Sequence, residues 1–283
     1  MSEGQQRYRH PGQVFMSRYW LLHNEESVFR YVDFLRQEAG LGDEPPIDLS
    51  LIYQHFGIPT PLRAPLGDQQ GILVDSDAGV ILIKEDDPIV RQRFTEGHEL
   101  MELLFDAQQR VASHRWNEQE KEQLCDRGAA DLLMPQSSFL PRLHEMGISF
   151  NTGQTLANLY QTSLLATLVR TIQHGKGACA LVMWHYALRR KEIDCLKDAD
   201  AQPQKKLRVW WRTWTKSWTS GFIPKNKSIS PDSLISFAYM TGQPQTGREI
   251  LDFGSGPICC QVEARPMQIG GKNCVLSLIY LLK

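Results

Sequence analysis

The segment at residues 87–105 constrains the fold most, because it has the pattern of one amphipathic helix whose polar side carries chemically active groups. His98 and Glu102 are four residues apart, so an α-helix places both on one face, one turn apart. The opposite stripe is apolar and is expected to face a core. Its members are Leu100, Leu103 and Leu104. The sequence therefore predicts a core helix with a polar site on its outer face.

The polar residues of this helix form a variant of a known metal motif. His98, Glu99 and Glu102 follow the HExxH pattern of helical zinc sites, with a carboxylate in place of the second imidazole. A catalytic zinc site has three protein ligands and one open position, so His98 and Glu102 would be two of the ligands. Glu99 would lie beside them as the general base. An ordinary solvated helix face explains the same three residues, and spacing alone leaves both interpretations open.

A second helix supplies the remaining candidates. It is predicted to begin at Asn117, where Glu120 completes a capping-box pattern, and to end before Pro135. Glu122 offers a third carboxylate ligand. Asp126 lies one turn later on the same face, where it could accept a hydrogen bond from the His98 ring. Two further histidines, His114 and His144, are possible replacement ligands, although a surface position explains each of them more simply.

The rest of the chain divides into a helical part and a β-rich part. Helices are predicted at 25–40 and 48–56, and the apolar runs between residues 71 and 84 predict a hairpin. The pattern becomes β-rich after a glycine-containing break at 174–177. We therefore expect two domains, at 21–174 and 177–283, preceded by a flexible N-terminus at 1–20.

Three stretches of the first part resemble the ImmA/IrrE family of bacterial metallo-endopeptidases. These are RQRFTEGHEL at 91–100, EQLCDRGAADLLMP at 122–135, and GISFNTGQTLANLYQTSLLATLVR at 147–170. The upstream segment PPIDLSLIYQHFGI at 45–58 also fits. The resemblance implies an α+β protein with a mostly helical, thermolysin-like (zincin-like) N-terminal domain that contains a small β element. The β-rich C-terminal domain would then be an additional α+β module, either a sensor or a partner-binding domain.

The resemblance also implies an activity. Family members cleave helix-turn-helix repressors in stress responses or mobile elements. Carried over, His98 and Glu122 are zinc ligands, Glu99 is the general base, and Asp126 supports the His98 ring. Position 102 departs from the family, which has histidine there.

The departure at position 102 leaves three outcomes open. A carboxylate can ligate zinc, but one imidazole with two carboxylates gives the ligand set a charge of −2 and favours harder ions such as Mn²⁺. The chain would then be an active endopeptidase with an altered metal site, a metal-binding protein with weak or no activity, or an inactive relic. A relic would act by binding its former repressor substrate or as a DNA-linked regulator.

Charge and cysteine content bear on partners and location. The chain has 31 basic and 32 acidic residues, so no overall field attracts nucleic acid. Residues 149–174 have the shape of a helix-turn-helix, but Arg170 and His174 are its main candidate phosphate contacts, too few for direct DNA binding. The six cysteines form no CxxC pair, and no apolar run is long enough for a membrane span. A cytoplasmic protein is expected.

Overall fold

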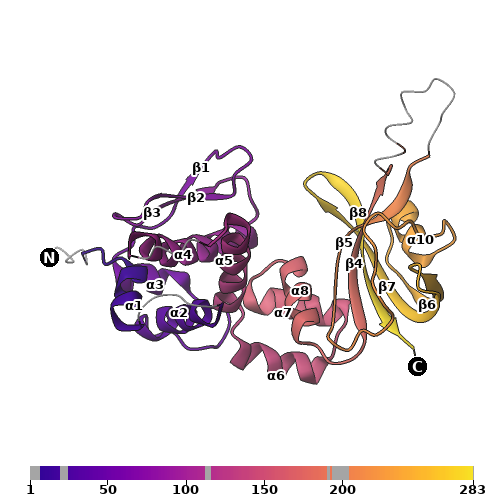
Figure 1. Ribbon diagram of the computed structural model, residues 1–283, viewed down its shortest axis with the longest axis horizontal. Coiled ribbons are helices and arrows are strands. Elements are labelled where there is room, and N and C mark those ends of the chain that lie inside the picture. Colours follow the sequence, from indigo (N-terminus) through magenta and orange to yellow (C-terminus); the bar gives the residue numbers. More distant parts are fainter. Residues whose placement is uncertain (1–6, 20–24, 112–115, 190–191, 193–203, 283) are drawn as a thin grey trace. The chain divides into compact units, whose positions relative to one another are not determined.

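A computed structural model describes residues 7–19, 25–111, 116–189, 192 and 204–282 (Figure 1). Its contacts divide the chain into two compact units. The first comprises Met1–Arg142 and Thr155–Ala166, and the second comprises Leu143–Gln154 and Thr167–Lys283. The first unit is mostly helical with a small sheet, and the second is built on a larger sheet. The α+β fold class predicted from the sequence is confirmed.

The first unit is organised around one long helix. Its elements are α1 (Pro11–Tyr19), α2 (Glu25–Glu38), α3 (Leu49–Phe56), β1 (Leu62–Ala64), β2 (Gly71–Asp75), β3 (Val80–Lys84), α4 (Ile89–Val111) and α5 (Glu118–Leu133). Helix α4 is the predicted motif helix, extended by about a turn and a half. Its apolar stripe, Leu100, Leu103 and Leu104, is fully buried, as the spacing predicted.

The N-terminal segment corrects one expectation. Residues 1–20 were expected to be flexible, whereas residues 11–19 form α1, which packs on α4. Phe15 enters the core at 2% exposure. His10 precedes the helix and lies 3.1 Å from the Asp106 carboxylate, measured from Nε2 to Oδ2. A buried aromatic ring and a buried polar contact fix this segment, and neither is visible as a periodic pattern in so short a stretch.

The small sheet lies beside α4 and has the strand order β1-β3-β2 (Figure 1). Strands β2 and β3 are the predicted hairpin and pair antiparallel, with Ile72 opposite Leu82. Strand β1 pairs parallel with β3 and was not predicted, because three residues are too few for a recognisable alternation. Among the described residues β2 pairs with β3 alone, so β2 is an edge strand next to the motif helix.

Helices α4 and α5 approach each other closely because small residues line their contact. A Cβ atom added to Gly128 of α5 would lie 2.6 Å from the Met101 sulfur of α4. Gly97 and Ala129 are neighbours in the same contact. Asn117 caps α5 as predicted, since its side chain accepts a hydrogen bond from the Glu120 N–H at 2.8 Å. This packing brings the polar face of α5 within reach of His98 and Glu102.

Three helices contribute to both units. They are α6 (Gln136–Met146), α7 (Phe150–Tyr160) and α8 (Leu164–His174), and the division into units passes through each of them. Residues 143–154 and 167–174 thus belong to the second unit, whereas the sequence placed the boundary near 174–177. Arg170, a candidate phosphate contact, is 4% exposed within α8. The structure therefore does not present its guanidinium as a contact for phosphate.

The second unit is a five-stranded antiparallel sheet with a helix on one face. Its elements are β4 (Cys179–Ala187), β5 (Lys206–Trp214), α10 (Leu234–Thr241), β6 (Gln245–Asp252), β7 (Pro257–Ile269) and β8 (Lys272–Leu281), in the strand order β5-β4-β8-β7-β6. Helix α10 packs on β6, β7 and β8. Trp184 is fully buried in this core, and its Nε1–H donates to the Ser277 hydroxyl at 2.8 Å.

No helix among the described residues is long and apolar enough to cross a membrane.

Candidate metal centre

Two donor atoms of the site come from one turn of α4. His98 Nε2 and Glu102 Oε1 are 3.8 Å apart, and both side chains are largely shielded from solvent, at 15% and 17% exposure. The four-residue spacing predicts that the two side chains lie on one face of the helix, as they do. Partial burial lowers the local dielectric, so charges placed here interact more strongly than on an open surface.

Helix α5 places Glu122 and Asp126 against the two sides of the His98 ring. Glu122 Oε2 lies 3.5 Å from His98 Nε2, and Asp126 Oδ1 lies 2.9 Å from His98 Nδ1. The Asp126 contact fixes which ring nitrogen carries the proton, so Nε2 is left with its lone pair directed toward the carboxylates. Burial alone would lower the pKa of His98, but the Asp126 contact and the nearby carboxylates raise it.

These distances suit a small divalent ion. Tetrahedral zinc with nitrogen and oxygen ligands needs donor atoms roughly 3.4 Å apart. The separations of 3.5 Å from His98 to Glu122 and 3.8 Å from His98 to Glu102 are close to this value. One imidazole and two carboxylates are also donors that zinc and manganese accept. The pairs His98–Glu102 and His98–Glu122 thus have separations that suit metal ligands.

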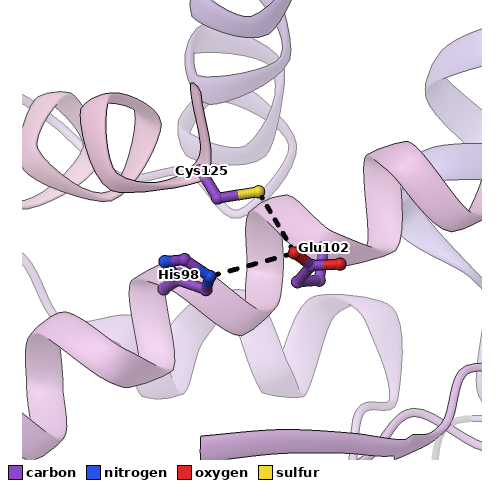
Figure 2. A group of neighbouring side chains, drawn as sticks. All are labelled: His98, Glu102 and Cys125. Carbon is purple, nitrogen blue, oxygen red and sulfur yellow. Dashed lines mark hydrogen bonds and ion pairs between the residues drawn. The ribbon is translucent and has the colours of Figure 1, made fainter. Parts of the chain in front are cut away.

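Cys125, which is buried, is a further donor at the same place, with its sulfur directed toward Glu102 (Figure 2). Its Sγ lies 3.5 Å from Glu102 Oε1, and the donor atoms of His98, Glu102 and Cys125 all lie within 4.8 Å of one another. Burial raises the pKa of the Cys125 thiol far above its usual value, and the Glu102 carboxylate adds to this. Cys125 is fully buried, and its place beside Glu102 was not anticipated from the sequence.

The remaining neighbour of Glu102 is a cation. Lys121 Nζ lies 2.9 Å from Glu102 Oε2 and 3.2 Å from Glu118 Oε1. Desolvation opposes the charged form of Lys121, but the contacts with the two carboxylates outweigh it and raise the lysine pKa. Sequence reasoning missed this residue. A signal was present, because Lys121 and Cys125 are four residues apart on α5 and so share a face of that helix.

Glu99 lies on the side of α4 that faces β2, and it is only 6% exposed. Its pKa is raised to about 7, chiefly by burial; Glu102 and Glu122 also raise it, while His98 and a backbone hydrogen bond from Leu73 lower it. A carboxylate with a pKa near neutrality exchanges protons readily at physiological pH, which is what a general base requires. Glu99 thus has the environment expected of its predicted role.

Gly71, the first residue of β2, makes this environment possible. A Cβ atom at Gly71 would lie 2.6 Å from Glu99 Oε1, so a larger residue would displace the carboxylate or the strand. Sequence reasoning treated Gly71 only as the start of a strand. A glycine opening a strand pattern does indicate close approach of another group, and here the groups are the Thr95 methyl and the Glu99 carboxylate of α4.

His144, one of the two further candidate histidines, does not join the site. His144 is exposed on α6, and His114 lies outside the described residues.

Comparison with known proteins agrees with this geometry. Residues 54–171 match the family model of the IrrE N-terminal-like domain, peptidase family M78. Residues 54–171 belong to the IrrE N-terminal-like family. The match contains α4, α5 and β2, hence every residue of the candidate centre. As M78 is a family of metallopeptidases, the IrrE N-terminal-like domain implies a metal ion and a protein substrate.

A solved structure resembles the whole chain. A Mycobacterium tuberculosis transcriptional regulator aligns with a TM-score of 0.58 over 96% of this chain and 80% of its own, at 14% sequence identity. At this identity the likeness shows the fold alone. No curated protein matches the sequence.

Proposed function

We propose that the first unit is a metal-dependent endopeptidase that cleaves a helix-turn-helix repressor protein. The observation that carries the proposal is that His98 Nε2 lies close to two carboxylates and beside a third, buried carboxylate. His98 Nε2 lies 3.8 Å from Glu102 and 3.5 Å from Glu122, and Glu99 follows His98 directly on α4 with a pKa of about 7. Metal ligands beside a proton-accepting carboxylate are the parts that metal-assisted hydrolysis requires.

In this proposal His98, Glu102 and Glu122 hold the ion, with Zn²⁺ the expected metal and Mn²⁺ a possible alternative. When bound, the ion would polarise the scissile carbonyl and lower the pKa of the attacking water. Glu99 takes a proton from that water and delivers it to the leaving nitrogen. Asp126 holds the His98 ring through Nδ1, which keeps Nε2 available as a ligand.

The edge of β2 offers a place for the substrate chain. Among the described residues β2 pairs only with β3, and its backbone already hydrogen-bonds to Glu99 at Leu73. An extended peptide that adds to such an edge is held by main-chain hydrogen bonds and passes close to the catalytic groups. This supports cleavage within an extended or locally unfolded segment of the repressor.

The position of Glu102 favours a second candidate, a metal-binding regulator that no longer cleaves. Lys121 forms an ion pair with one oxygen of Glu102. A neutral histidine at this position could not form such an ion pair. The likeness to a solved transcriptional regulator is compatible with either candidate, since it is a likeness of fold.

The two candidates separate in a cleavage assay. The purified full chain, loaded with Zn²⁺ or with Mn²⁺, is incubated with a panel of helix-turn-helix repressors that includes any encoded beside its gene, and products are identified by mass spectrometry. We expect fragments with the wild type and none with Glu99→Gln. Repressor that stays intact while wild-type protein retains its metal would reject the endopeptidase and leave the regulator.

A further inference from the structure

The charge of the donor set changes when Lys121 is included. One imidazole and two carboxylates carry −2, whereas two imidazoles and one carboxylate carry −1. Lys121 Nζ lies 2.9 Å from Glu102 Oε2, and the two side chains are only 14% and 17% exposed. The ammonium therefore brings the local charge back to −1, within a partly buried setting where solvent screens it little.

Because of the contact with Lys121, the two oxygens of Glu102 have different partners. Oε1 faces the donor cluster, 3.8 Å from His98 Nε2 and 3.5 Å from Cys125 Sγ. Oε2 faces Lys121. A carboxylate held in this way offers a single oxygen to an ion. Lys121 and Asp126 therefore have similar roles. Lys121 contacts Glu102 Oε2, and Asp126 contacts His98 Nδ1; in each case this is the ligand atom that points away from the cluster.

Glu118 keeps the ammonium in place. Its Oε1 lies 3.2 Å from Lys121 Nζ, three residues earlier on α5. Lysine carries three N–H donors, so it can bind both carboxylates at once. Without Lys121 both oxygens of Glu102 would be free to bind an ion, and a two-oxygen carboxylate suits larger ions with more ligands, such as Mn²⁺.

We propose that Lys121 is a positioning residue that makes Glu102 a one-oxygen ligand and thereby sets the preference of the centre for Zn²⁺ over Mn²⁺. This inference rests on the metal site of the proposed function. It explains how a carboxylate can stand in the position of the second imidazole of HExxH while the ligand number and the local charge stay the same.

The test compares metal preference in four full-length proteins. They are the wild type, Lys121→Ala, Lys121→Arg and Arg127→Ala. Arg127 is the matched control, because it also carries a positive charge on α5 but pairs with Glu25 and lies over the Phe29 ring. Zn²⁺ and Mn²⁺ dissociation constants are measured by competition with chelators. Lys121→Ala should lower the preference for Zn²⁺ by about 10-fold or more, the size of effect seen when a ligand loses its supporting contact.

Lys121→Arg and Arg127→Ala should keep the wild-type preference. The Co²⁺ absorption spectrum gives a second readout, since four-coordinate Co²⁺ absorbs strongly in the visible and higher coordination absorbs weakly. Lys121→Ala should lose intensity, and Lys121→Arg should not. Lys121→Leu replaces the alanine variant if circular dichroism shows that variant to be unfolded.

Failure of the proposed role of Lys121 and failure of the metal site give different results. An unchanged Zn²⁺ preference and Co²⁺ spectrum in Lys121→Ala, with metal bound by the wild type, overturns the role of Lys121 and leaves the metal site standing. No binding of either ion by the wild type overturns the site and this inference together.

Discussion

Gly71 and Glu99 lie so close that a single added methyl group at Gly71 would sit 2.6 Å from Glu99 Oε1. The start of strand β2 and the side chain of Glu99, the proposed general base, are therefore closely packed, with no room for a Cβ atom between them. Gly71→Ala should displace the Glu99 carboxylate and reduce repressor cleavage by about 100-fold, the cost typical of a misplaced catalytic group. Metal content should be unchanged, because Glu99 is not a ligand. Cleavage by Gly71→Ala at the wild-type rate would show that the placement of Glu99 does not matter.

Burial of Glu99 should cost stability in the metal-free protein. Its folded pKa of about 7 lies above its ordinary value of 4.5, so the folded state binds the proton more tightly. Stability is therefore full below pH 4.5 and falls as the pH rises through 7. Glu99→Gln should be more stable than wild type by about 3 kcal/mol at pH 8 and about equal to it at pH 4.

Urea denaturation at both pH values, in the presence of a chelator, measures this difference. His98 titrates in both proteins, and in Glu99→Gln its pKa loses the contribution of the Glu99 charge that raises it. A stability difference that is the same at pH 4 and pH 8 would mean that Glu99 is not desolvated as described.

Two sets of three ligands share His98 and Glu102, and they differ in whether Glu122 or Cys125 is the third ligand. The Cys125 thiol distinguishes them. Cys125 Sγ lies 3.5 Å from Glu102 Oε1, while Glu122 Oε2 lies 3.5 Å from His98 Nε2. If Glu122 is the third ligand, the Co²⁺ protein should show no thiolate-to-cobalt charge-transfer band, and Cys125→Ser should bind Zn²⁺ as wild type does. A charge-transfer band that Cys125→Ser abolishes would assign Cys125 as a ligand instead.

Glu102→His should tighten Zn²⁺ binding, because it replaces a carboxylate that is shared with Lys121 by an imidazole ligand. The same change removes the group that Lys121 holds. In the Glu102→His background, Lys121→Ala should therefore no longer alter the Zn²⁺ to Mn²⁺ preference, which is a non-additive result. Chelator competition on the single and double variants measures it. Additive effects would show that Lys121 acts elsewhere than on Glu102.

The sequence predicted the parts of this protein whose signals are periodic or local. The i to i+4 spacing placed His98 beside Glu102, and the capping pattern placed the start of α5 at Asn117. It missed Lys121, Cys125 and Gly71, because their roles arise from contacts between elements that are distant in sequence. A lysine beside a ligand is ordinary until a neighbouring helix supplies its partner. The same reason explains the missed helix α1, which is fixed by contacts with α4.

The most direct test of the central claim is metal stoichiometry by elemental analysis of the purified full chain. Convergence of His98, Glu102 and Glu122 predicts close to one divalent ion per chain in the wild type and in Glu99→Gln, and loss of that ion in His98→Ala. Wild-type protein that binds no zinc or manganese when supplied with either ion, or His98→Ala protein with an undiminished metal content, would contradict the account.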